Sequence, residues 1–114
     1  MLDIQKMTEK TREALAAAGA AAREYGHQEI RPIHLLAALM RQDGGLLPSL
    51  LKRIGTPNSL LCEAVEAELA KLPKVSGNAA DVYPSRDFSN ILVEARDRAE
   101  KMKDEYIKIG RAHV

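Results

Sequence analysis

Residues 24–36 read EYGHQEIRPIHLL, and this stretch decides the fold because it ends one helix and begins the next. Gly26 has no Cβ, so it can adopt the left-handed conformation that commonly closes a helix. Pro32 suits the first turn of a helix, where its missing N–H leaves no hydrogen bond unmade. Ile30 is the strongly apolar residue between them, and we expect it to anchor the turn on the core.

Apolar residues at helical spacing on both sides of this turn predict an all-α first half of four helices. The expected ranges are residues 7–25, 32–42, 46–54 and 57–71. Thr8 and Thr56 are the expected N-caps of the first and fourth helices. The alanine-rich run at residues 16–22 is interpreted as a surface for tight helix packing. The residues expected to face inward from the second and fourth helices are Ile33, Leu35, Leu36, Leu39, Met40, Leu60, Leu61, Val65 and Leu69.

The character of the sequence changes after Pro73. Residues 74–84 show no periodicity and are interpreted as a linker. Ser85 then caps a predicted fifth helix. The apolar stripe of this helix consists of Phe88, Ile91, Leu92, Ala95, Ala99 and Met102.

An internal repeat relates the first and fifth helices. Leu15 matches Leu92 and Tyr25 matches Met102 at one offset of 77 positions, which also places residues 28–30 on residues 105–107. We therefore expect a turn at 105–107. Beyond it the match fails, so we expect a first four-helix repeat at 1–72, a linker at 73–84 and the first helix and turn of a truncated second repeat at 85–108. Residues 109–114 form an atypical tail, and whether it is native or artefactual stays open.

Composition argues against several functions. Seventeen Lys and Arg are interleaved with sixteen Asp and Glu, which does not favour nucleic-acid binding, and no apolar run is long enough to span a membrane. The sequence contains no glycine-rich phosphate loop, so we expect no ATP binding. We also expect no catalysis. His27 and His34 lack further ligands at metal-binding spacing, and we expect a loop hydrogen bond for the first and a first-turn helix contact for the second. Cys62 is alone, as is common in a reducing cytosol.

Several motifs together resemble a known family. They are Thr8-Glu9-Lys10, the EYGHQEI of residues 24–30, the Pro-x-His-Leu-Leu of residues 32–36, LPKVSG at 72–77, DVYPS at 81–85 and DEYI at 104–107. The sequence resembles the N-terminal Clp repeat (R) domain of the Clp ATPases, and within them it looks most like the ClpB disaggregases.

This resemblance implies a fold of two pseudo-repeats of four helices each, the second truncated here. It implies a binding domain without cofactor, placed ahead of two ATPase modules that use ATP and magnesium and assemble as a cytoplasmic homohexamer. Its partners would be exposed apolar segments of unfolded or aggregated proteins, with no nucleic acid and no membrane.

The resemblance also implies substrate-protein binding by Thr8, Leu92 and Asp104, and it implies no catalytic or metal site. Each residue has a plainer interpretation as well: a helix cap for Thr8, core packing for Leu92 and a helix-end or turn hydrogen bond for Asp104. Ile33 and Gly110 stand where the family usually has Glu.

Two other functions remain open from the sequence. One is the adaptor-binding N-domain of a protease-partnered Clp ATPase. The other is a free-standing Clp-repeat interaction protein. If the second repeat is truncated, we expect the fifth helix either to expose much of its apolar stripe or to cover it against the first four helices in a way that the family does not.

Overall fold

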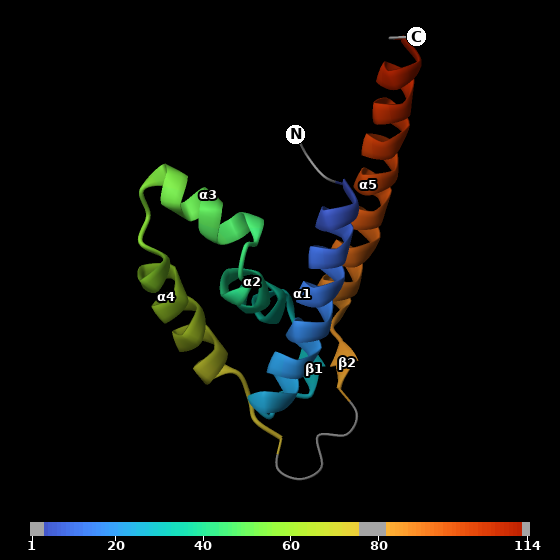
Figure 1. Cartoon of the computed structure of the whole chain (residues 1–114). Helices are drawn as coiled ribbons and strands as arrows, with labels where there is room; N and C mark the ends of the chain where they lie inside the picture. The colour runs from blue at the N-terminus through green and yellow to red at the C-terminus, as the bar shows by residue number, and fades with distance from the viewer. Residues whose placement is uncertain (1–3, 76–81, 113–114) are drawn as a thin grey trace.

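The described part of the chain, residues 4–75 and 82–112 of a computed structural model, forms five helices and one short strand pair. All-α is therefore the correct fold class. Helices α1 to α4 cluster together, and α5 extends away from them (Figure 1). In order, the elements are α1 (Ile4–Glu24), β1 (Glu29–Ile30), α2 (Pro32–Arg41), α3 (Leu46–Ile54), α4 (Asn58–Lys71), β2 (Tyr83–Pro84) and α5 (Arg86–Ala112).

The core lies where α2 meets α4. Ala37 and Met40 of α2 and Val65 and Leu69 of α4 form a buried apolar cluster, in which Leu69 is fully buried. Partly buried side chains complete it: Tyr25, Ile33, Leu36, Leu47, Leu61, Cys62 and Leu72. Few aromatic residues are needed, because Leu, Met and Ala fill the space between these short helices.

Small residues let α1 and α2 approach closely, as the alanine-rich run predicts. Ala18 and Ala22 are fully buried, and Ala21 is nearly so. A Cβ added at Gly19 would lie 3.6 Å from Cδ1 of Ile30, so the half-buried Ile30 packs directly on this part of α1. The expected anchoring of the turn by Ile30 is confirmed.

The turn after α1 closes as the sequence predicts. Gly26 has φ +74°, and its N–H donates to the carbonyl of Arg23, while the His27 N–H donates to that of Ala22. These two hydrogen bonds form a Schellman motif, which satisfies carbonyls left open at the helix end. Pro32 is the first residue of α2.

Three local predictions in the first half are wrong. Helix α1 begins at Ile4, because Gln5 and Lys6 are good helix formers, and Thr8 consequently lies in the second turn instead of at the N-cap. Pro57, not Thr56, occupies the N-cap position of α4. Leu60 is 62% exposed at the start of α4, where no other helix covers it, and so does not face inward.

The interior of α2 also differs from the expectation. His34 is fully buried, whereas Leu35 and Leu39 are only half-buried. Met40 is buried as expected. The polar ring of His34 can occupy the interior because it has hydrogen-bond partners there.

A parallel strand pair, which the sequence did not predict, attaches the second half to the first. Glu29 pairs with Tyr83 and Ile30 with Pro84. The N–H groups of Tyr83 and Ser85 donate to the carbonyls of Gln28 and Ile30. Residues 83–84, interpreted above as part of a linker, are therefore held against the turn that follows α1.

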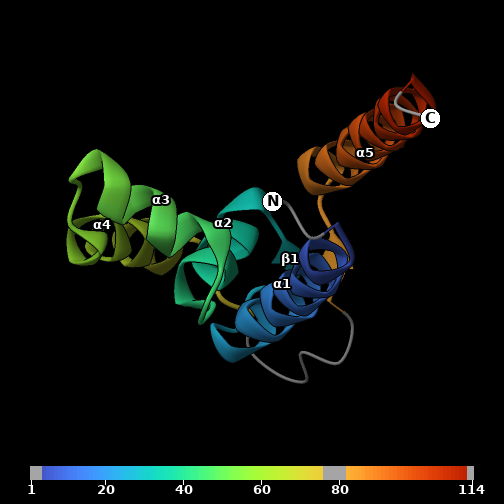
Figure 2. The ribbon, with the colours of Figure 1, turned by 45° about the horizontal axis from the view of Figure 1, so that its top comes forward.

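Helix α5 begins as predicted and ends later than predicted. The Phe88 N–H donates to Oγ of Ser85 over 3.1 Å, so Ser85 is the N-cap. The helix continues through residues 105–107, where the repeat predicted a turn. Lys103 stands 77 positions after Gly26, and a residue with a Cβ does not favour the left-handed conformation that closes α1. The result is one long helix that projects from the rest, as Figure 2 also shows.

Candidate functional site

The structure does not bring the predicted binding residues onto one surface. Thr8 lies in α1, where its side chain is outside the described part of the molecule. Leu92 is half-buried and Asp104 is exposed, both on α5. Their separation of twelve residues corresponds to about 18 Å along the helix and about 120° around it. Asp104 is in mid-helix, so its interpretation as a turn or helix-end residue is wrong.

The Leu92 stripe, meaning Phe88, Ile91, Leu92, Ala95, Ala99 and Met102, runs along one side of α5. Phe88 is 4% exposed, and the start of α5 packs against the first half of the chain. Beyond it the stripe opens to solvent: Ile91 is 40% exposed and Met102 60%. Of the two expected arrangements, exposure of much of the stripe is confirmed, with the buried Phe88 and the half-buried Leu92 as exceptions.

A second exposed apolar row lies on α3 and was not singled out from the sequence. Leu46, Leu50 and Ile54 follow one another at intervals of four residues, so they share one side of the helix. All three are exposed in the structure. Among the described residues of α3, Leu51 is the one that is buried. The four-residue spacing shows in the sequence that the three residues share one side of the helix. It does not show whether that side faces the core or the solvent.

A groove of about 500 Å³ lies between α1 and α2. Its floor is made of small apolar residues, including Ala14, Ala17 and Ala21 of α1 and Ala38 of α2. Charged and polar side chains surround this floor: Lys10, Glu13, Glu24, Arg41, Gln42 and Asp43. The alanine-rich run in the sequence already indicates the small residues of the floor. The position of the rim depends on how α1 and α2 cross, which only the structure shows.

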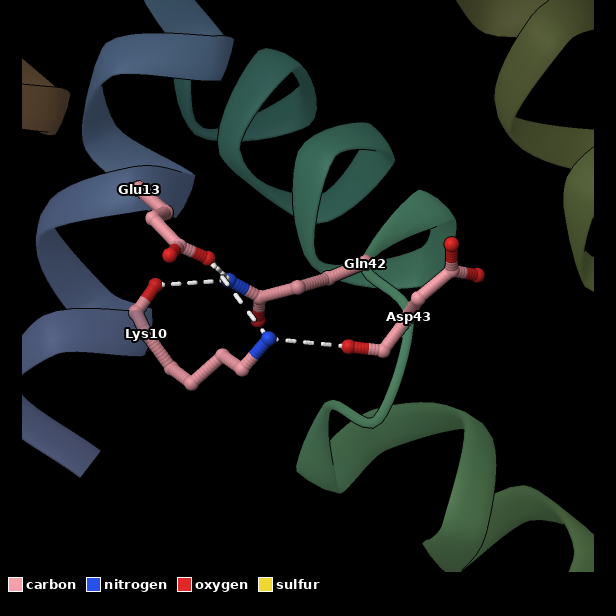
Figure 3. Close-up of polar contacts among 4 residues, drawn as sticks. All are labelled: Lys10, Glu13, Gln42 and Asp43. Atoms are coloured by element: carbon pink, nitrogen blue, oxygen red, sulfur yellow. Dashed lines mark hydrogen bonds and ion pairs between the residues drawn. The ribbon is translucent and has the colours of Figure 1, made fainter. Parts of the chain in front are cut away.

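Hydrogen bonds at this rim connect α1 to the end of α2 (Figure 3). Nζ of Lys10 donates to the carbonyl of Asp43 over 2.9 Å and lies 3.6 Å from a carboxylate oxygen of Glu13. Nε2 of Gln42 donates to the carbonyl of Lys10 over 2.7 Å. Within the rim, Lys10 and Glu13 form an ion pair, and the hydrogen bonds of Lys10 and Gln42 tie α1 to the end of α2.

His27 of the turn and His34 of α2 contact each other in the interior. Nδ1 of His27 lies 2.8 Å from Nε2 of His34, and the two rings are 2% and 0% exposed. The hydrogen bond expected for His27 is therefore made to His34, and the first-turn contact expected for His34 is made by its Nδ1, which accepts from the Arg31 N–H. In the part of the chain that the structure describes, no cluster of three or more His, Cys, Asp or Glu is placed to hold a metal ion.

None of the helices, over the residues that the structure describes, is long and apolar enough to cross a membrane.

Comparison with known proteins identifies the family. The profile of the Clp repeat (R) N-terminal domain matches residues 6–112. The chaperone protein ClpB of Nitratidesulfovibrio vulgaris is 44% identical over 111 residues, which are 95% of this chain and 13% of that protein. ClpB of Clostridium tetani is 35% identical over the same shares. The chain thus spans about an eighth of the length of these curated relatives.

A solved structure agrees with the sequence relatives. It is described as "Preliminary structural investigations of a malarial protein secretion system". It aligns with a TM-score of 0.67 and 27% identity, covering 82% of this chain and 64% of the other. Sequence profile, relatives and fold together show that the chain belongs to the Clp repeat N-terminal domain family.

Proposed function

We propose that this chain is the client-recruitment domain of a ClpB-type, ATP-dependent protein disaggregase. It would bind exposed apolar segments of unfolded or aggregated proteins. The observation that carries the proposal is the Leu92 stripe, which presents apolar side chains to solvent along a projecting helix. Covering such a surface with another apolar segment is favourable, because both lose contact with water.

Binding at this stripe would be weak, and weakness suits the function. Two or three side chains such as Ile91, Leu92 and Met102 each contribute roughly 1.5–3 kcal/mol when fully covered. Ordering the client and losing its translational freedom cost several kcal/mol. We therefore expect dissociation constants on the order of 0.1–1 mM for one isolated domain. A client held this loosely can be released to the next component.

The roles of Thr8 and Asp104 as client contacts remain proposals based on the family resemblance. Asp104 is exposed, so it is free to meet a polar group of a bound segment. A segment touching Leu92 and Asp104 at once would have to pass obliquely around α5, because the two lie on different sides of it. The organisation proposed for the chain is a first repeat at 1–72, a linker at 73–84 and the start of a second repeat at 85–108.

The proposal for the complete protein follows its relatives. The domain would precede two ATPase modules, which bind ATP and magnesium and form a cytoplasmic homohexamer. It would itself carry out no catalysis and would act by raising the local concentration of clients at the ring. Several weakly binding domains on one ring would hold an aggregate more tightly than one domain does.

The test measures binding of a fluorescently labelled, reduced and carboxymethylated polypeptide that cannot fold. Titration with the 114-residue chain should raise its anisotropy. Ile91→Glu should weaken binding at least fivefold, because it places a charge in the Leu92 stripe. Ile54→Glu is the matched control, since Ile54 is an exposed apolar residue on α3.

Equal loss in both variants, or loss only in Ile54→Glu, would contradict the assignment of α5. The same assay tests the polar positions. Asp104→Ala and Thr8→Ala should each weaken binding about twofold or more, and unchanged affinity would exclude them as client contacts.

A further inference from the structure

A chain of hydrogen bonds runs from the main chain of Arg31 into the interior. The Arg31 N–H donates to Nδ1 of His34 over 2.8 Å, so this nitrogen carries no proton. The neutral His34 ring therefore has its proton on Nε2, which lies 2.8 Å from Nδ1 of His27. Nε2 of His34 donates in this contact, and His27 accordingly carries its own proton on Nε2. The geometry assigns the same tautomer to both rings.

This arrangement leaves no room for an additional proton. A proton on Nδ1 of His34 would face the Arg31 N–H, and one on Nδ1 of His27 would face Nε2–H of His34. Each would set donor against donor at a site that is 0–2% exposed. Nε2 of His27 is buried without a hydrogen-bond partner among the described residues. Protonation therefore requires the site to open.

The net effect of the surroundings opposes positive charge on the two rings, although backbone contacts with Leu69 and Arg31 act in the other direction. Burial lowers the pKa of His27, and the charges of Lys74 and Arg31 lower it further. Burial, His27 and Arg31 likewise lower the pKa of His34. Tyr25 at the end of α1 stacks on His27 with centroids 5.6 Å apart. The nearby carboxylate of Glu29 in β1 is already engaged, with Oε2 lying 3.3 Å from Nε of Arg31.

The turn between α1 and α2 carries His27 of the histidine pair (His27 and His34), and it also holds the second half of the chain. The carbonyl of Gly26 accepts from Val75 over 2.8 Å, and those of Gln28 and Ile30 accept from Tyr83 and Ser85. Val75 follows α4, and Ser85 caps α5. The same turn, residues 25–31, thus holds both the residue that follows α4 at position 75 and the residues that lead into α5.

We propose that the histidine pair is an acid-sensitive latch, whose protonation releases the attachment of α5 at residues 75 and 83–85 while the α2–α4 core stays folded. The latch would control how rigidly the Leu92 stripe is held relative to the first four helices. That last consequence rests on the proposed client-binding function, whereas the latch itself does not.

Amide hydrogen exchange of the 114-residue chain, followed by NMR between pH 5 and 7.5, tests the latch. After correction for intrinsic rates, opening at the amides of Val75, Tyr83 and Ser85 should increase about tenfold per pH unit for each histidine protonated below about pH 6.5. The amide of Thr56, which donates to Leu51 far from the pair, should show no such increase. Ring ¹⁵N shifts should report Nε2–H tautomers at neutral pH and protonation over the range in which opening increases.

Two substitutions separate the latch from general acid unfolding. The Oδ1 of an Asn side chain can accept a hydrogen bond where Nδ1 of the His ring did, and it does not titrate. His27→Asn should therefore reduce the pH dependence of opening, and the double substitution with His34→Asn should abolish it. Equal acceleration at Thr56, an acid response that survives the double substitution, or rings that titrate while these amides stay protected would each overturn the proposal. Because none of these readouts uses a client, a failed latch leaves the binding proposal standing.

Discussion

Two glycines separated by seven residues should respond to alanine in opposite directions. Gly26 has φ +74° after α1, and an L-residue with a Cβ is disfavoured in that conformation by roughly 1–2 kcal/mol. Gly19 lies inside α1, where alanine is favoured over glycine by roughly 0.5–1 kcal/mol. Its new Cβ would lie 3.6 Å from Ile30, an ordinary van der Waals contact, so no clash offsets this gain.

We therefore expect Gly26→Ala to destabilise the chain and Gly19→Ala to stabilise it, with free energies of unfolding that differ by roughly 1.5–3 kcal/mol. Urea unfolding followed by far-UV circular dichroism measures the difference, and each variant is the other's control. The m-value should stay unchanged, because the surface exposed on unfolding is the same. If Gly26→Ala were as stable as the parent, the left-handed Schellman turn could not be the required closure of α1.

Three further outcomes follow from the packing and the charges. Leu69→Ala should cost about 3 kcal/mol in urea unfolding, since Leu69 is fully buried, whereas Leu60→Ala at a 62% exposed site should change stability by less than about 0.5 kcal/mol. Ser85→Ala should cost about 1 kcal/mol and increase amide exchange in the first turn of α5; unchanged exchange would exclude the cap. The lowered pKa of His27 and of His34 means that the neutral rings stabilise the fold above about pH 6.5, and that this stability is lost below it by up to about 1.4 kcal/mol per pH unit for each ring. A melting temperature that stays constant from pH 7.5 to 5 would contradict this.

Local signals in the sequence predicted much of the first half correctly. Gly26 and Pro32 mark a helix end and a helix start because their backbone preferences are intrinsic. The predictions that failed there involve competition between neighbours. Thr8 is a good cap, yet the residues before it form helix equally well. Leu60 is strongly apolar, yet its burial depends on a covering helix that is not present at that position.

The repeat was a less reliable guide than the individual residues. It matched apolar residues in two segments that are both helical, although Ala18 and Ala22 are buried and Ala95 and Ala99 are exposed, and it wrongly predicted a turn at 105–107. A periodic stripe requires only similar side chains at intervals, whereas a turn requires a residue such as Gly26 to close it. Lys103, which stands at the equivalent position, would adopt the left-handed conformation only at a cost in free energy, so α5 continues.

The sequence by itself determined the all-α class, the ends of most helices in the first half and the apolar stripe of α5, because each depends on residues adjacent in the chain. The family was also recognisable from its local motifs. Only the tertiary structure decided that β2 attaches to the turn after α1 and that His27 and His34 share a buried hydrogen bond. These features depend on backbone directions and on contacts between segments far apart in the chain, which no local periodicity encodes.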